Sequence, residues 1–240
     1  MPISEVNTVS FGSATIRYTV ERRRRKSLAI SVVPSGEVVV YAPVDAEADR
    51  VREKVHKKAP WILRQKWYFD GFGSEAPPRR FVSGEAHRYM GRQYRLKVLA
   101  GSDADVKLIA GYLHVHLPDK DSPDAVNKAI AKWYRQRAEM RLPEIVDRCA
   151  ERLKGFGIER PVLRFNTFAK RWGSYSRQGR MWLNVDLIKA PLPCIEYVIT
   201  HELCHQKEHN HGGEFFRLLN KVMPDWVKRK ERLERVMSGV

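Results

Sequence analysis

The amino-acid sequence predicts an α+β protein, with an antiparallel β-rich N-terminal region followed by a helix-rich C-terminal domain. Segments of alternating apolar and polar residues, separated by Gly and Pro turns, dominate residues 1–118. Apolar residues at helical spacing dominate residues 122–240. Between the two lies the turn-forming stretch Pro118-Asp119-Lys120-Asp121-Ser122-Pro123, which we take as the boundary between the two regions.

The N-terminal region is expected to contain short strands and one long helix. The strands share period-two alternation, and they cover residues 14–20, 28–33, 38–41, 94–99, 106–109 and 112–117. Pro34-Ser35-Gly36 would connect the second and third of these as a hairpin. Residues 46–72 form a basic segment with one apolar side, which predicts a helix that bends near Pro60.

The C-terminal domain is expected to begin with a long helix. Ser122 can cap that helix and Pro123 suits its first position, so it would run to about Lys154 with a break at Pro143. A small antiparallel sheet and three further helices would follow. The expected strands cover residues 162–168, 172–175 and 181–184, and the expected helices cover residues 193–210, 215–222 and 226–236.

The most informative motif is His201-Glu202-Leu203-Cys204-His205. Two histidines four residues apart lie on one face of an α-helix, so both imidazoles can bind one metal ion. Glu202 stands one step further round the helix, close enough to reach a water molecule beside that metal. Cys204 is turned about 100° away from each neighbour and is expected to be a small core residue.

A third ligand is expected just after this motif. If the helix stops near Asn210, ahead of the paired glycines 212 and 213, the chain can turn and bring His211 back to the metal. Three neutral imidazoles would leave the ion its full charge and a fourth position for water, whose pKa would fall towards about 7. Three other residues remain candidates for this position, namely Glu208, His209 and Glu214.

Several runs in this part of the chain resemble the YgjP-like metallopeptidases, which are zincins related to the SprT-like proteases. The runs lie between about residues 160 and 226, and they are Lys170-Arg171-Trp172-Gly173-Ser174, Trp182-Leu183-Asn184, Tyr197-Val198-Ile199-Thr200-His201-Glu202-Leu203-Cys204-His205, Asn210-His211-Gly212 and Phe215. The resemblance implies a zincin-like catalytic domain over residues 122–240. It also implies one zinc ion held by His201, His205 and His211, with Glu202 as the general base.

Hydrolysis of peptide bonds is the activity that these residues favour. Lys170 and Arg171 precede the small sheet, where they could stabilise negative charge in a transition state or hold the loop in place. The segment 181–184 could pair as an edge strand with an extended peptide. Two alternatives stay open: hydrolysis of a non-peptide substrate such as a nucleotide, and a nucleic-acid-binding module with a structural zinc.

The chain is strongly basic. Its 44 basic and 28 acidic residues give a formal net charge of +16, of which each half of the sequence carries +8. Such a spread of charge over folded surface makes nucleic acid or another acidic molecule a plausible partner. The run Arg22-Arg23-Arg24-Arg25-Lys26 could bind phosphates or form a solvated hairpin. No internal repeat is evident in the sequence.

Other features indicate the expected location. Three cysteines, Cys149, Cys194 and Cys204, form no disulfide framework, which favours a reducing cytoplasm. The first residues, 1–5, lack the basic start and apolar core of a signal peptide. No run of 18 apolar residues is present, so we expect no membrane span. The oligomeric state is not indicated by the sequence.

Overall fold

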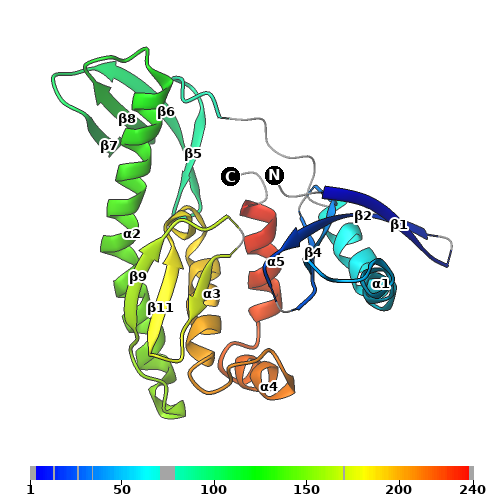
Figure 1. Cartoon of the computed structure of the whole chain (residues 1–240). Helices are drawn as coiled ribbons and strands as arrows, with labels where there is room; N and C mark the ends of the chain where they lie inside the picture. The colour runs from blue at the N-terminus through cyan, green and yellow to red at the C-terminus, as the bar shows by residue number, and fades with distance from the viewer. Residues whose placement is uncertain are drawn as a thin grey trace. The chain divides into compact units, whose positions relative to one another are not determined.

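The computed structural model describes residues 4–12, 14–25, 27–33, 35–70, 79–169 and 171–237. Within these ranges the chain contains both helices and mostly antiparallel sheets, as the α+β prediction requires (Figure 1). The contacts divide it into two compact units, with the division after Pro77. The boundary expected at residues 118–122 lies inside the second unit, because the strands before it and the helix after it share one core.

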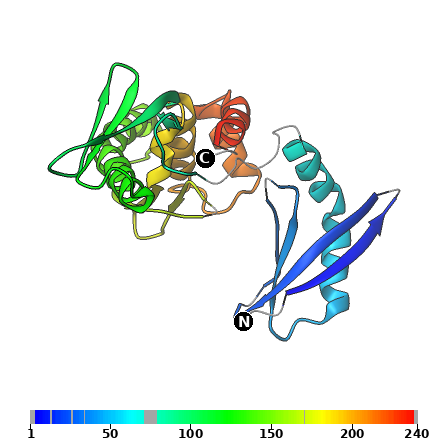
Figure 2. The same ribbon diagram turned by 90° about the horizontal axis from the view of Figure 1, so that it is seen from above.

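The described part of unit 1, up to residue 70, is a four-stranded sheet with one helix. Its elements are β1 (Ser4–Phe11), β2 (Ala14–Arg23), β3 (Ala29–Val32), β4 (Val38–Pro43) and α1 (Ala48–Asp70). The strand order is β1-β2-β4-β3, with two antiparallel hairpins joined by a parallel contact between β2 and β4. Helix α1 lies along one face of this sheet (Figure 2).

The core of unit 1 lies between that sheet and α1. Alternate residues of β2 and β4 meet helix residues spaced three or four apart, so both periodicities of the sequence point into one core. The fully buried members are Ile16, Val40, Ala42, Val55, Ala59 and Ile62. Helix α1 continues through Pro60 to Asp70. Strand β1 was not expected from the sequence. Val9 is its buried residue, and a single buried position does not produce the alternating pattern by which a strand is recognised.

Unit 2 begins with a second four-stranded sheet. Its strands are β5 (Ala86–Tyr89), β6 (Arg92–Ala100), β7 (Asp105–Ile109) and β8 (Tyr112–Leu117). The order β5-β6-β8-β7, with outer antiparallel pairs and a central parallel pair, is the same as in unit 1. A helix follows in both cases. The chain therefore repeats a ββββα topology, which the sequence analysis did not detect.

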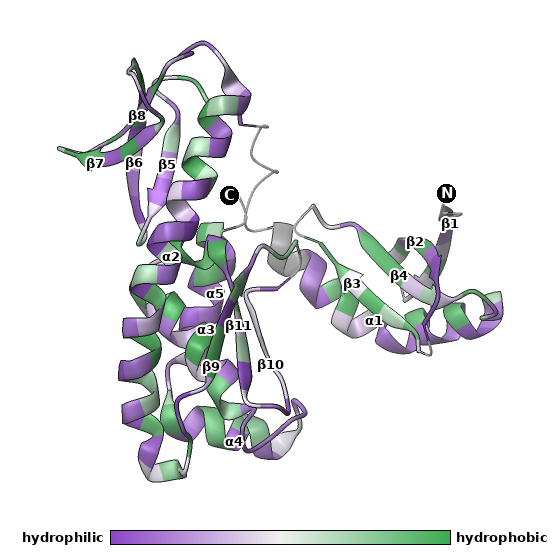
Figure 3. Ribbon diagram, turned by 60° about the vertical axis from the view of Figure 1, so that its left-hand side comes forward, coloured by the Kyte–Doolittle hydropathy of each residue, from purple (hydrophilic) through white to green (hydrophobic). Residues whose placement is uncertain are grey.

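The helix that follows, α2 (Pro123–Leu153), connects this second sheet to the rest of unit 2. Ser122 caps it as expected, accepting a hydrogen bond of 3.3 Å from the Ala125 N–H. The expected break at Pro143 is wrong, because the helix runs on through it. The neighbours Leu142 and Val146 are fully buried, and their packing offsets the hydrogen bond that proline removes. Apolar and polar residues alternate along α2 (Figure 3).

The third sheet stands beside the C-terminal half of α2. Its strands are β9 (Val162–Asn166), β10 (Gly173–Tyr175) and β11 (Arg180–Asn184), in the order β10-β11-β9. Two expectations are corrected here. The sheet is mixed, since β11 pairs with β9 in parallel. The segment 181–184 is the central strand and not an edge, which is why Met181 and Leu183 are both fully buried.

Short helices complete unit 2. They are the 3₁₀ turns η1 (Lys154–Phe156) and η2 (Val185–Lys189), followed by α3 (Leu192–Cys204), α4 (Gly213–Val222) and α5 (Trp226–Met237). Helix α3 ends at Cys204, earlier than the expected end near Asn210, because residues 206–210 offer no apolar side to bury. Among the described residues, no helix is both long and apolar enough to span a bilayer.

Candidate metal centre

Helix α3 carries the first two histidines of the site. Ile195, Ile199 and Leu203 are fully buried and hold this helix in the core of unit 2. His201 and His205 project from the same side of its last turn, with ring centroids 5.2 Å apart. The spacing of four residues therefore brings both imidazoles to one place, as the sequence predicted.

His211 reaches the same place from the turn after α3. Its Nε2 lies 2.9 Å from the Nε2 of His201, and its ring centroid lies 4.7 Å from that of His205. One nitrogen from each of the three rings falls within 4.8 Å of the others. Within the ranges that the structure describes, this is the one group of three or more His, Cys, Asp or Glu side chains with such geometry.

The other candidate ligands lie apart from this group. Glu208 contributes its backbone carbonyl, which accepts a hydrogen bond of 2.8 Å from the Nδ1 of His205. A carbonyl can only accept, so Nδ1 carries a proton, and in a neutral ring Nε2 then keeps the lone pair that could bind a metal. Glu214 forms an ion pair with Arg217 on α4, and His209 is exposed. Cys204 is fully buried, as expected of a core residue.

The side chain of Phe215 packs against all three imidazoles. Its ring is fully buried at the start of α4, and the centroids of His201, His205 and His211 lie 4.9, 4.7 and 4.8 Å from it. One aromatic side chain thus packs against every candidate ligand. The sequence analysis included Phe215 in the family resemblance but gave it no role.

Burial lowers the pKa of two of the three histidines. It lowers the pKa of His201 to about 3, with further lowering from the neighbouring His211 and His205. The pKa of His211 is also lowered, first by burial and then by His205. Neutral imidazole is the form that binds metal, and imidazole nitrogens suit zinc, copper, iron and nickel. The donor set therefore fits a divalent transition metal.

Glu202 lies beside this group, enclosed by the third sheet. Only 7% of the residue is exposed, and burial raises the pKa of its carboxyl to about 7, against the opposing effects of the Arg171 charge and the Tyr175 N–H. Gly173 on β10 faces it closely. A Cβ at position 173 would stand 2.9 Å from Cγ and 3.1 Å from Oε1 of Glu202, so only glycine fits there.

The sequence model of the YgjP-like metallopeptidase domain matches residues 26–236, most of the chain. The chain belongs to the YgjP-like metallopeptidase family. A solved structure, the metallopeptidase zymogen of Pyrococcus abyssi abylysin, is also similar: it shares 21% sequence identity and a TM-score of 0.36, covering 41% of this chain and 96% of that one. No curated protein sequence matches the chain.

Asn184 of this YgjP-like metallopeptidase fixes the loop segment that precedes β10 by hydrogen bonds. Its side-chain amide donates to the carbonyls of Phe168 and Arg171 at 2.8 and 3.0 Å, while its own N–H donates to the Trp172 carbonyl at 2.8 Å. Asn184 is 2% exposed, so these bonds are shielded from water. The sequence analysis quoted this residue in the resemblance and missed its role.

One of the two basic residues expected near the site, Arg171, belongs to this same loop. Arg171 is exposed, its guanidinium lies 4.4 Å from the centre of the Phe168 ring, and its charge lowers the pKa of Glu202. Lys170 lies outside the described residues. In this metallopeptidase the loop is therefore attached to the sheet by Asn184, with one cation facing the carboxylate.

Proposed function

We propose that this YgjP-like metallopeptidase hydrolyses peptide bonds with one zinc ion held by His201, His205 and His211, and with Glu202 as general base. The observation that carries the proposal is the convergence of three imidazoles on one place, next to the buried carboxylate of Glu202. Three protein ligands with an open fourth position are typical of catalytic zinc, whereas structural zinc has four. The family membership supports a metal-dependent hydrolase.

The zinc ion and the residues around it would have separate roles in the reaction. When bound, zinc would lower the pKa of a water molecule and polarise the substrate carbonyl. Glu202 takes a proton from the water and returns it to the leaving amine, which requires a group that exchanges protons near neutral pH. Without the metal, burial raises the pKa of Glu202 to about 7, and the positive charge of a bound zinc ion would lower it towards the ionised form that accepts a proton. Gly173 and the loop held by Asn184 keep the carboxylate in place.

Strand β10 is the better candidate for the substrate strand. It is an edge strand of its sheet, and its first residue, Gly173, contacts Glu202 directly. An extended peptide could add to that edge by main-chain hydrogen bonds, which would set its scissile bond beside the carboxylate. Strand β11, which the sequence favoured, is covered on both sides by β10 and β9. Proteins or peptides with an extended segment are thus the proposed substrates.

Glu202→Gln is the variant that tests this proposal. It removes the base and keeps the shape of the side chain, so we expect casein cleavage to fall by at least about 10²-fold. Elemental analysis should find the same zinc content in the variant and the wild type, at one ion per chain. His211→Ala provides the matched variant for the metal, and it should lose most of the zinc.

Other outcomes identify the alternatives. Retained casein cleavage in Glu202→Gln would exclude Glu202 as the base. Hydrolysis of nucleoside triphosphates, with casein left intact, would reassign the centre to a non-peptide substrate. Zinc at full occupancy in His211→Ala would move the third ligand to Glu208, His209 or Glu214. Zinc binding with no hydrolysis of either substrate would favour a structural metal.

A further inference from the structure

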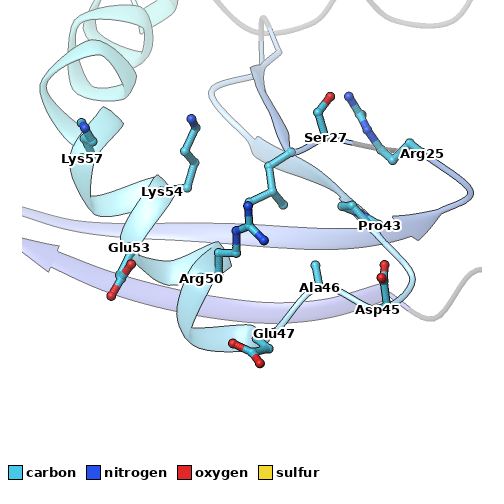
Figure 4. Close-up of a pocket in the computed structure, with 11 residues that line it drawn as sticks. Arg25, Ser27, Pro43, Asp45, Ala46, Glu47, Arg50, Glu53, Lys54 and Lys57 are labelled. Carbon is cyan, nitrogen blue, oxygen red and sulfur yellow. The ribbon is translucent and has the colours of Figure 1, made fainter.

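Unit 1 contains a groove that the metallopeptidase site does not use. It has a volume of about 860 Å³ and lies between the start of α1 and the segment that connects β2 to β3 (Figure 4). Four cationic side chains line it, Arg25 from the connecting segment and Arg50, Lys54 and Lys57 from α1, together with the hydroxyl of Ser27. The groove so defined is called the basic groove below.

The three helix cations share one side of α1. Positions 50, 54 and 57 follow the spacing of four and three residues that places side chains on one face. The opposite face of the helix supplies Val55 and Ile62 to the core of unit 1. The cations are therefore directed into the groove by the same periodicity that builds the core.

These cations have carboxylates in the same groove but, among the described residues, pair with none of them. Among the residues that the structure describes, Arg25, Arg50, Lys54 and Lys57 form no ion pair. Three carboxylates also line the groove, those of Asp45, Glu47 and Glu53, and none lies within ion-pair distance of them. Figure 4 shows the Glu53 carboxylate pointing away from the ammonium of Lys54. The cations remain available to an anion from outside.

Two members of the arginine run, Arg22 and Arg23, have structural partners, and Lys26 lies outside the described residues. Arg22 donates to the carbonyls of Val44 and Ala46 at 3.1 and 2.8 Å, which fixes the segment between β4 and α1. Arg23 pairs with Glu21. These contacts make neither residue available for a ligand, so Arg25 is the member of the run that faces the groove.

The second ββββα segment shows that this topology does not require the cations. Arg50, Lys54 and Lys57 are the third, seventh and tenth residues of α1. The same positions of α2 hold Ala125, Ala129 and Lys132, and both alanines pack against the core of unit 2. Positive charge at the third and seventh positions is therefore specific to unit 1.

The arrangement of the cations favours an extended polyanion. Seven residues of helix separate Arg50 from Lys57, which corresponds to about 10 Å along the axis, so the charges are spread along the groove and do not converge on one point. Among the described residues that line the groove, none is aromatic, so bases would find no stacking platform there. We infer that the basic groove binds the phosphate backbone of a nucleic acid without reading its sequence.

The inference is tested on the full-length, metal-loaded protein by fluorescence anisotropy with a labelled DNA duplex. The test variant is Arg50→Gln/Lys54→Gln/Lys57→Gln. The matched control, Lys58→Gln/Arg64→Gln/Lys66→Gln, removes the same charge from the same helix outside the groove. We expect the test variant to bind at least about 10-fold more weakly than the control. In a plot of log K against the logarithm of the salt concentration, the magnitude of the slope should fall by up to about 3 in the test variant, roughly one per lost phosphate contact.

Circular dichroism and zinc content should be unchanged in both triple variants, and binding should survive Glu202→Gln. Three results would overturn the inference: no salt-dependent binding by the wild type, equal weakening in both triple variants, or unchanged binding in the test variant. Free nucleoside triphosphate that displaces the duplex at equal phosphate concentration would replace nucleic acid by a small anion. Any of these results leaves the proposed peptidase function untouched, because its residues lie in unit 2.

Discussion

The sheet β1–β4 with α1 and the sheet β5–β8 with α2 have the same strand order and the same strand directions, yet their helices are used differently. The 23 residues of α1 serve one sheet, and the core they form is their own. The 31 residues of α2 first cover the β5–β8 sheet and then enter the core that supports the metal centre. The longer helix α2 thus joins its sheet to the core around the candidate metal centre, whereas α1 forms a core with its own sheet alone.

The two helices differ after the positions at which both have buried residues. Val51, Val55 and Ala59 of α1 correspond in position to Val126, Ile130 and Tyr134 of α2, and all six are buried. Beyond them, α2 keeps adding fully buried residues, namely Ala138, Leu142 and Val146. The first turns of the helix therefore build the module, and the later apolar residues attach it to its neighbours.

The strongest test of this contrast removes one fully buried side chain from each helix. Leu142→Ala should destabilise unit 2 by about 2–5 kcal/mol and weaken zinc binding, because the cavity lies in the core that holds α3. Ile62→Ala should cost a similar amount in unit 1 alone and leave casein cleavage unchanged. Calorimetry with hydrogen exchange would separate the two transitions. If either variant shifts both transitions together, the two units are not independent.

A second test uses the buried carboxyl of unit 2. In metal-free protein, the pKa of Glu202 is raised from 4.5 to about 7 in the folded state, so folding favours the protonated form. Its stabilising contribution is present below pH 4.5 and is lost as the pH rises through 7. The loss amounts to at most about 3 kcal/mol. His201 contributes a slope of the opposite sign, because its pKa is lowered from 6.5 to about 3. The difference in unfolding free energy between wild type and Glu202→Gln should therefore carry the Glu202 slope, and a difference that does not change with pH would assign the slope to another group.

A third test concerns the close contact under Glu202. Gly173→Ala places a Cβ 2.9 Å from the Glu202 side chain, so β10 or the carboxylate must move. We expect a cost of about 1–3 kcal/mol in unit 2 and a fall in kcat that exceeds the change in KM. Gly155→Ala is the matched control, since a Cβ there meets nothing within 4 Å. Equal kcat values in the two variants would show that Gly173 does not position the base.

The smallest expected effect distinguishes the starts of the two helices. Ser122 caps α2 through the Ala125 N–H, whereas the corresponding position before α1 is Glu47. Ser122→Ala should cost about 1 kcal/mol in unit 2. Glu47→Ala should change unit 1 by less than half of that. Paired urea titrations would measure both, and equal losses would show that the cap does not distinguish the helices.

Local periodicity made the positions of the three histidines predictable. His201 and His205 are four residues apart on a helix, and that spacing alone brings their rings together. The glycines at 212 and 213 correctly indicated a turn that returns His211. Helix α3 nevertheless ends earlier than expected, because apolar residues that would bury a further turn are missing after Cys204.

Long-range pairing accounts for most of what the sequence did not reveal. Alternation identifies a strand but not its neighbours or their direction, so the parallel contact of β9 with β11 and the central place of β11 were missed. The ββββα repeat was hidden because its two copies share buried positions while their exposed residues differ. The closeness of Gly173 to Glu202 joins residues of two distant elements, and no local pattern records it.

The single ring of Phe215 has a consequence for how the metal centre responds to its surroundings. This side chain contacts all three imidazoles and is the first buried residue of α4. A metal ion bound by these imidazoles would therefore be coupled to the packing of α4, and the coupling free energy would be the same in both directions. Metal occupancy would then report on packing in the C-terminal helices without any substrate.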